Sequence, residues 1–96
     1  MAAFIFATVQ VKDPEKWGEY GKQAGQTLEP FGGELLFRGK FVEQLAGGEP
    51  HSANAVLKFP DVQAARDWYA SPAYQAIIPT RDAGADVVFS LCDEIA

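Results

Sequence analysis

Cysteine and histidine are scarce in this chain, since Cys92 and His51 are the single residues of their types among 96. One cysteine excludes an internal disulfide and a metal site built from several cysteines. A chain without disulfides fits a reducing compartment, so we expect a cytoplasmic protein. The single histidine also leaves few side chains for acid–base chemistry near neutral pH.

Positive charge is also limited, with 8 Lys and Arg against 13 Asp and Glu and a formal net charge of −5. No segment gathers the basic side chains that follow a phosphate backbone, which argues against a nucleic-acid partner. The apolar run at residues 1–7 has no positive flank and is far shorter than the ~18 residues of a spanning helix. We therefore expect no membrane partner either.

Known catalytic and cofactor motifs are missing from the sequence. It contains no glycine-rich phosphate loop, no nucleophile elbow, no His-Glu-x-x-His zinc motif and no cluster of metal-ligating residues. The sequence therefore predicts no cofactor and no metal site.

The composition itself is that of a globular protein, with 48% hydrophobic and 22% charged residues. We expect one domain over residues 1–96. A chain this short buries only roughly 60–65% of the surface that its unfolded form exposes, so a partner that covers apolar area would add stability.

Residues 4–11 alternate in the manner of a strand and are rich in strand-forming side chains. Asp13-Pro14 then offers a capping oxygen and a proline at the first helical position, which predicts a helix that ends near Pro30. One face of this helix is apolar and should pack on the sheet. The residues of this face are Trp17, Tyr20, Ala24, Leu28 and Phe31.

Three glycines, Gly18, Gly21 and Gly25, interrupt the same helix. Each disfavours it by about 1 kcal/mol relative to alanine, so its stability must come from tertiary packing. Two interpretations remain open: a close approach of the helix to the sheet, or a locally mobile helix that lines a cavity.

The middle of the chain predicts two strands. Residues 34–38 and 41–45 are short apolar-rich runs separated by Gly39-Lys40, which indicates a bent or bulged second strand. A turn is expected at 47–50, and residues 53–59 alternate as a third strand.

The last third of the sequence predicts helices and a final strand. Asp61 can cap one helix, and Ser71-Pro72 repeats the cap-then-proline signal before a short helix from Ala73 to about Thr80. Residues 87–92 alternate as the last strand. The order β-α-β-β-α-β predicts an α+β ferredoxin-like fold, with a four-stranded antiparallel sheet and helices on one face.

The second face of that sheet needs a cover, because the first and last strands carry apolar side chains on both faces. No remaining segment is long enough to supply it. We therefore predict a homodimer that packs sheet against sheet, forming a dimeric α/β barrel.

Several strings carry a family resemblance, and Trp-Tyr-x-Ser-Pro-x-Tyr-Gln is the most specific. They are Asp13-Pro14, Tyr20, Phe31-Gly32-Gly33, Leu36-Phe37-Arg38-Gly39, Phe59-Pro60-Asp61, Ala64–Tyr69, Ser71–Gln75 and Arg81. Over roughly residues 3–93 the chain resembles the domain-of-unknown-function family 1330. The resemblance implies the dimeric α/β-barrel superfamily, which includes small monooxygenases, muconolactone-isomerase-like enzymes and proteins without known chemistry.

The chain departs from the family pattern at two places. Lys58 stands where members often have an acid, and residues 45–48 replace a more usual Leu-Glu-Gly. The resemblance implies no general activity.

A candidate pocket surrounds the junction between the two short helices, where polar tips can converge above an aromatic floor of Trp17, Trp68 or Phe31. The ligand-binding candidates are Tyr20, Trp68, Tyr69, Ser71, Tyr74 and Arg81. The alternative is structural: Ser71 caps a helix, the tyrosines are core aromatics with bonded hydroxyls, and Arg81 pairs with Asp82, Asp86 or a helix C-terminus.

The candidate catalytic residues are Arg81 and His51. Arg81 would bind a carboxylate or polarise a carbonyl, with Tyr20 or Tyr74 as hydrogen-bond donor. Proton transfer would fall to His51 or a tyrosine, although the turn before His51 favours a solvated loop residue over an acid–base or ligand contact. Cys92 is expected to be inert core. The expected ligand is a small aromatic or carboxylated molecule.

Three functions stay open. The first is a cofactor-independent enzyme, of isomerase, lyase or monooxygenase type, acting on a small organic molecule. The second is a non-catalytic module that binds a small hydrophobic molecule or another protein, and the third is a purely structural dimer. An ionisable group that reaches the cavity would favour the enzyme, since proton transfer needs a donor or acceptor next to the substrate.

Overall fold

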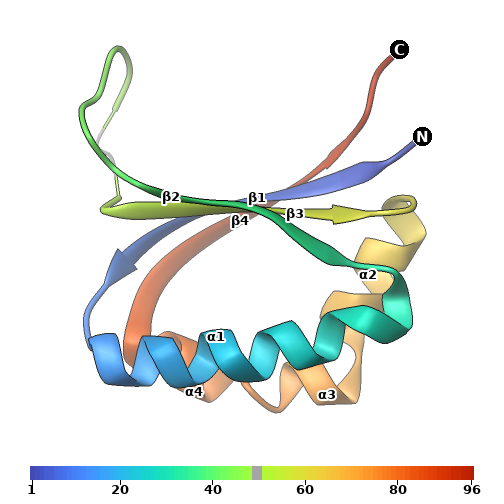
Figure 1. Ribbon diagram of the computed structural model, residues 1–96, viewed down its shortest axis with the longest axis horizontal. Coiled ribbons are helices and arrows are strands. Elements are labelled where there is room, and N and C mark those ends of the chain that lie inside the picture. Colours follow the sequence, from blue (N-terminus) through green and yellow to red (C-terminus); the bar gives the residue numbers. More distant parts are fainter. Residues whose placement is uncertain (49–50) are drawn as a thin grey trace.

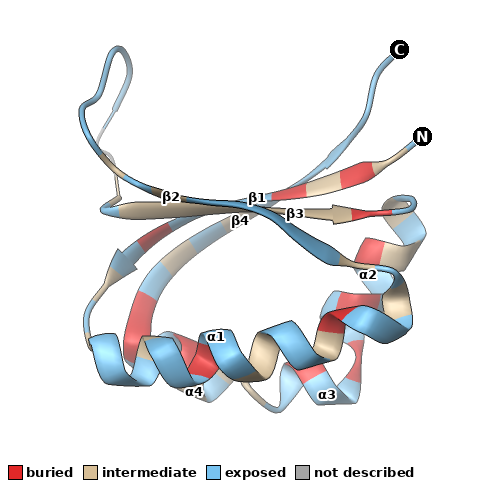
Figure 2. Cartoon of the chain, in the orientation of Figure 1, coloured by how far each residue is buried: buried red, intermediate tan, exposed pale blue. Residues whose placement is uncertain are grey.

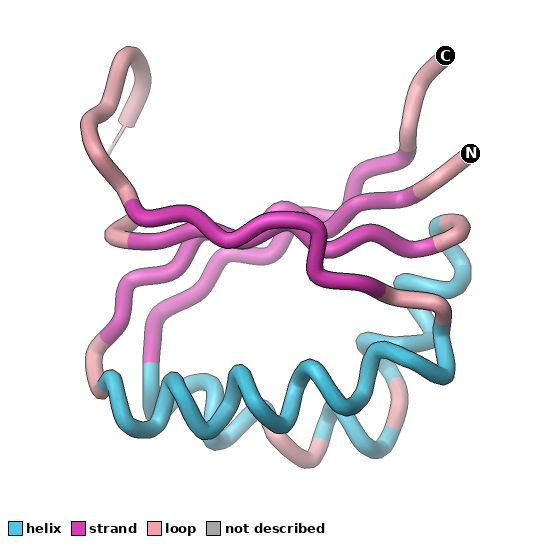
Figure 3. Tube along the Cα trace, in the orientation of Figure 1, coloured by secondary structure: helices cyan, strands magenta, loops and turns pink. Residues whose placement is uncertain are grey.

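The fold has two layers, a four-stranded sheet and a set of helices packed on one of its faces (Figures 1 and 3). The computed structural model describes residues 1–48 and 51–96. The strands are β1 (Ala3–Val11), β2 (Glu34–Lys40), β3 (Ala53–Phe59) and β4 (Ala85–Asp93). The helices are α1 (Pro14–Leu28), the 3₁₀ turn η1 (Glu29–Phe31), α2 (Val62–Ala70), α3 (Pro72–Gln75) and α4 (Ile78–Gly84).

All neighbouring strands are antiparallel, and their order is β2-β3-β1-β4. The strands β1 and β3, which each lead into a helix, lie in the centre, whereas β2 and β4 form the edges. The predicted ferredoxin-like βαββαβ fold is thereby confirmed.

The predicted helix starts are also confirmed. The Asp13 carboxylate accepts hydrogen bonds from the backbone N–H groups of Glu15 (3.1 Å) and Lys16 (3.3 Å). The Asp61 carboxylate accepts one from the Ala64 N–H at 2.7 Å. These side chains satisfy backbone donors that have no partner within the first helical turn.

The second strand is shorter than predicted. It does contain a bulge, but the register shifts between Leu35 and Phe37 and not at Gly39-Lys40, where the sequence predicts the bend. The strand β2 ends at Lys40, so the expected strand over 41–45 is wrong. The Phe41 N–H still bonds the Ser52 carbonyl at 3.0 Å, and the chain then leaves the sheet. The predicted turn at 47–50 lies partly outside the described residues.

The short helix predicted over 73–80 is two helices, α3 and α4. Pro79 lies in the first turn of α4, where its missing N–H is harmless. The same proline could not continue α3, because it cannot donate the next hydrogen bond of that helix.

The core lies between the sheet and the helices (Figure 2). The predicted apolar face of α1 packs here, with Tyr20 and Leu28 buried. The largest fully buried side chains are Trp68, Tyr74 and Phe59. The indole N–H of Trp68 donates to the hydroxyl of Thr27 on α1 at 2.9 Å, so α2 is joined to α1 by a polar contact as well.

The opposite face of the sheet carries large apolar side chains that nothing in the described chain covers. Phe6, Phe37 and Val88 on this outer face are 47%, 54% and 54% exposed. Cys92 is exposed beside Phe4, so the expectation of a core cysteine is wrong. Successive side chains of a strand point to opposite faces of the sheet, and Cys92 lies on the outer face, between positions of β4 whose side chains point inward. The loop after β2 and both termini rise on this side (Figure 1).

None of the described helices combines the length and hydropathy needed to cross a bilayer.

Candidate functional site

A cavity of about 390 Å³ lies between α1 and the inner face of the sheet. Its sheet side includes Val9, Ala55, Leu57 and Phe89. Its helical side comes mainly from α1, and Trp68 of α2 also lines it. The volume falls in the range of small-molecule sites, and most of the lining is apolar.

The three glycines of α1 line this cavity. A Cβ atom added at Gly18, Gly21 or Gly25 would meet nothing within 4 Å. The interpretation of a close helix–sheet approach at these glycines is therefore wrong. The glycines line a cavity, as the alternative predicts, and the local mobility of the helix stays a prediction. Each glycine destabilises α1 by about 1 kcal/mol relative to alanine, and no close contact at these positions offsets this loss.

Two of the predicted ligand-binding residues, Tyr20 and Trp68, line the cavity. Both are almost fully buried, at 5% and 1% exposed. The ring of Trp17 stacks on that of Tyr20 with centroids 4.9 Å apart and adds a third aromatic side chain to the lining.

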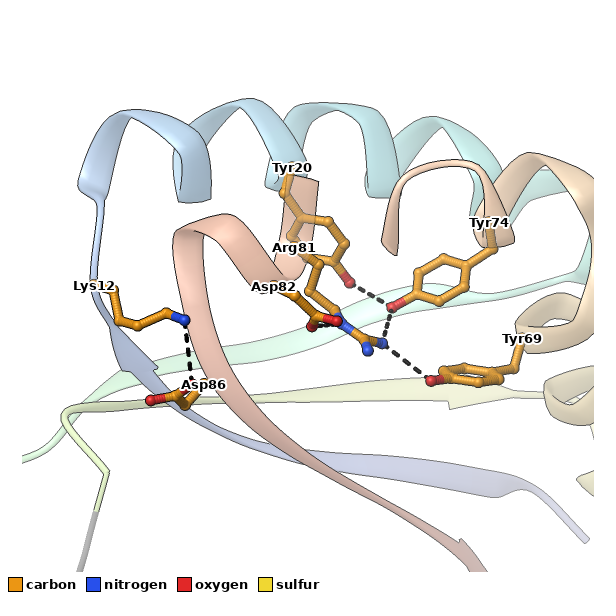
Figure 4. Close-up of polar contacts among 7 residues, drawn as sticks. All are labelled: Lys12, Tyr20, Tyr69, Tyr74, Arg81, Asp82 and Asp86. Atoms are coloured by element: carbon orange, nitrogen blue, oxygen red, sulfur yellow. Dashed lines mark hydrogen bonds and ion pairs between the residues drawn. The ribbon is translucent and has the colours of Figure 1, made fainter. Parts of the chain in front are cut away.

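The predicted residues Tyr74, Arg81 and Tyr69 form a polar network beside the cavity (Figure 4). The hydroxyls of Tyr20 and Tyr74 lie 2.8 Å apart. Arg81 Nη1 donates to Tyr74 at 3.2 Å and to Tyr69 at 3.0 Å. Arg81 Nε donates to Asp82 at 3.0 Å. Tyr20 is the member of this network that also lines the cavity.

This network has the features of the structural alternative. Arg81 is buried, pairs with Asp82 and lies over the Phe89 ring, 5.4 Å from its centroid. Asp86, the other acid considered for it, pairs instead with Lys12 at 3.3 Å.

Ser71 also has a structural position. Its hydroxyl accepts from the Tyr74 N–H at 3.3 Å and donates to the Trp68 carbonyl at 2.7 Å. It therefore caps α3, and the structure places it outside the lining of the cavity.

His51 lies on the other side of the sheet. It borders a recess together with the outer-face residues Thr8, Asn54 and Val88. The structure therefore does not bring His51 to Arg81 or to the helix–sheet cavity of the same chain.

The environment favours the protonated hydroxyls of Tyr20 and Tyr74. Burial raises the pKa of Tyr20, and the neighbouring Tyr74 raises it further. Burial also raises the pKa of Tyr74, against hydrogen bonds from Tyr20 and Arg81 that lower it. Burial lowers the pKa of Arg81, but its hydrogen bonds to Tyr69, Tyr74 and Asp82 outweigh this and raise it overall. Tyr20 can therefore donate a hydrogen bond at neutral pH but cannot serve as a base.

Two further residues at the cavity, Lys22 and Arg38, were absent from the predicted site. Arg38 is hard to place from the sequence because simple alternation puts it on the opposite face from Leu35. The bulge between Leu35 and Phe37 inserts one extra residue and shifts the alternation of side chains by one position. Both Leu35 and Arg38 therefore face the helices. Within residues 1–48 and 51–96, no cluster of three or more His, Cys, Asp or Glu side chains is placed to hold a metal ion.

A family model described as "Domain of unknown function (DUF1330)" matches residues 2–95. The chain belongs to this family. No curated protein is significantly similar to this DUF1330 protein.

Solved structures share the fold. A protein of unknown function from Rhodopseudomonas palustris is 20% identical with a TM-score of 0.82, covering 99% of this chain and 83% of its own. SnoaB, a cofactor-independent oxygenase from Streptomyces nogalater, is 12% identical with a TM-score of 0.72 and coverages of 99% and 94%. A dimeric ferredoxin-like protein of unknown function from Bacteroides fragilis is 9% identical with a TM-score of 0.59 and coverages of 97% and 96%. At these identities the likeness establishes the fold alone.

Proposed function

We propose that this DUF1330 protein binds a small organic molecule in the cavity between α1 and the sheet, as a homodimeric α/β-barrel protein. The observation that carries the proposal is the open, largely apolar cavity along Gly18, Gly21 and Gly25. A helix that only needed stability would gain from filling these positions, because packing and helix propensity would both improve.

The ligand would contact the aromatic rings of Trp17, Tyr20 and Trp68. Burial of an apolar ligand surface against such rings provides the main favourable free energy. Arg81, Tyr69 and Tyr74 would act as positioning residues, since their hydrogen bonds hold the Tyr20 ring at the cavity wall.

The lining chemistry favours binding over an isomerase or lyase reaction. Within the part of the chain that the structure describes, the cavity lining includes no carboxylate and no imidazole, and burial raises the pKa of Tyr20. A proton abstraction needs a base within hydrogen-bond reach of the substrate. His51, the other candidate base, borders the outer face of the sheet.

Cofactor-independent oxygenation is a second candidate. Its support is the fold shared with SnoaB and the aromatic lining of the cavity, which would exclude water from a bound substrate. Oxygen consumption that starts when a bound compound is added, without metal or flavin, would favour this candidate over simple binding.

The proposed homodimer would cover the outer face of the sheet. Phe6, Phe37 and Val88 supply exposed apolar area there, and large apolar patches on a monomer mark interaction surfaces. The protein from Bacteroides fragilis with the same fold is described as dimeric. In such a dimer the recess beside His51 would lie at the interface rather than at the ligand.

Binding can be tested by isothermal titration with a neutral aromatic probe, 2-naphthalenemethanol. Gly21→Leu would place a side chain in the cavity, where the added Cβ meets no atom. Gly48→Leu is the matched control, because Gly48 also has open space around it but lies in the loop after β2. We expect saturable binding to the wild type and to the control, and at least a tenfold loss in Gly21→Leu. Equal binding to all three proteins would contradict the proposal.

A further inference from the structure

We infer that the cavity selects a ligand with an apolar body and one anionic head group, and that Arg38 and Lys22 bind the head. The inference rests on the proposed binding in this cavity and specifies the chemical class of the ligand.

The two cations reach the cavity from different elements. Lys22 lies on α1 and Arg38 on the edge strand β2, and both side chains are exposed as well as lining the cavity. An anionic group at the solvent end of the cavity would thus meet a cation from the helix and one from the sheet, while the rest of the ligand contacts the apolar wall.

Neither cation forms an ion pair with an acid among the described residues. The ion pairs among residues 1–48 and 51–96 are Lys12–Asp86 and Arg81–Asp82, so Lys22 and Arg38 belong to neither. Among residues 1–48 and 51–96, no Asp or Glu lines the cavity, although the full sequence carries a net charge of −5. The cavity therefore concentrates positive charge on an acidic protein, and charges next to an apolar wall interact more strongly than charges in bulk water.

Arg38 suits this role better than the predicted Arg81. The Nε and Nη1 atoms of Arg81 already bond Asp82 and two tyrosines. None of the side-chain hydrogen bonds among residues 1–48 and 51–96 involves the Arg38 guanidinium, which leaves its planar fork for two parallel bonds to a carboxylate. Lys22 would add a point charge.

The apolar wall of the cavity restricts which chemical groups the body of the ligand can carry. Hydroxyl or phosphate groups along the body would be buried without partners against side chains such as Val9, Leu57 and Phe89. This disfavours sugars and nucleotides and favours an aromatic or aliphatic monocarboxylate.

The test compares two probes of one shape, 2-naphthoate and neutral 2-naphthalenemethanol, by isothermal titration. We expect the wild type to bind the carboxylate about tenfold more tightly than the alcohol. Arg38→Gln and Lys22→Gln should each reduce this ratio, and the double variant should bring it close to one. The affinity for the alcohol should change much less than the affinity for the carboxylate. Lys16→Gln, which removes one charge from α1 outside the cavity, is the matched control and should keep the full ratio.

The outcomes separate the inference from the binding proposal. A preference for the carboxylate that survives in the double variant, with both probes lost in Gly21→Leu, would overturn the role of the two cations and leave binding intact. An alcohol that binds as tightly as the carboxylate in the wild type would overturn the ligand class. Binding of both probes that Gly21→Leu does not weaken, or no binding of either probe to the wild type, would overturn both.

Discussion

The Tyr20 and Tyr74 hydroxyls lie 2.8 Å apart in the core, and this contact joins the wall of the cavity on α1 to α3. Arg81 extends the contact to α4 by donating to Tyr74 at 3.2 Å. Tyr74 is therefore the centre of a buried polar cluster, in which each hydroxyl must keep a partner because an unpaired buried polar group is costly.

Tyr74→Phe should destabilise the fold more than Tyr20→Phe. Removing the Tyr74 hydroxyl takes a partner from both Tyr20 and Arg81, whereas removing that of Tyr20 leaves Tyr74 bonded to Arg81. We expect the free energy of unfolding to fall by about 2–3 kcal/mol in Tyr74→Phe and by about 1 kcal/mol in Tyr20→Phe. Urea denaturation measures both losses. The reverse order would contradict the bridging position of Tyr74.

Stability should fall in alkaline solution. The folded-state pKa values of Tyr20 and Tyr74 are raised, while an unfolded tyrosine titrates near pH ~10. As the pH rises, the unfolded chain therefore loses the protons of these two hydroxyls before the folded chain does. The contribution of the two hydroxyls to the free energy of unfolding is complete below about pH 10 and is lost as the pH rises above it. Urea midpoints between about pH 8 and pH 12 should show this loss, and Tyr20→Phe should make it shallower. An identical slope in Tyr20→Phe would remove Tyr20 from the explanation.

Glycine-to-alanine changes should have opposite effects at two sites. A Cβ at Gly25 meets no atom, so Gly25→Ala should stabilise α1 by about 1 kcal/mol. A Cβ at Gly84 would lie 2.6 Å from the backbone nitrogen of Trp17, where α4 ends against the start of α1. Gly84→Ala should therefore destabilise the protein by about 1–3 kcal/mol. Thermal unfolding should show a higher melting temperature for Gly25→Ala and a lower one for Gly84→Ala than for the wild type. A stabilising Gly84→Ala would contradict the packing described for α4.

Phe6→Asp should dissociate the proposed dimer, since it places a charge in the centre of the exposed apolar face. Sedimentation at micromolar concentration should give twice the chain mass of 10.4 kDa for the wild type and the single mass for the variant. Cys92, on the same face, should react faster with maleimide in the variant.

Gln26→Asp is the control for this experiment, because it adds the same charge on α1 in the helical layer. It should sediment as the wild type does. A monomeric wild type would contradict the sheet-to-sheet dimer.

Most of the fold could be predicted because its signals are local. Asp13, Asp61 and Ser71 each cap a helix as their sequence positions indicate. Alternation also gave β3 its bounds, Ala53–Phe59. These features depend on neighbouring residues alone, so one sequence contains them.

The site was less predictable because it depends on features that act over distance. The inward position of Arg38 follows from a bulge between Leu35 and Phe37, whereas the glycine signal places the irregularity at Gly39-Lys40. His51 borders a recess with the outer-face residues Thr8 and Val88, which are distant from it in the sequence. The burial of Arg81 follows from the packing of α4 against Tyr69 and Tyr74. Residue type identified polar candidates, but only the tertiary arrangement separates those at the cavity from those beside it.

The central proposal, binding between α1 and the sheet, is tested most directly by amide chemical-shift mapping of the wild-type protein titrated with 2-naphthoate. Glycine amides at Gly18, Gly21 and Gly25 report on one wall of the cavity, and the Ala55 amide on the other. We expect saturable shifts at all four amides, with those of the outer-face residues Phe6 and Val88 unchanged. Shifts confined to the outer face, or none at α1, would contradict the proposed site.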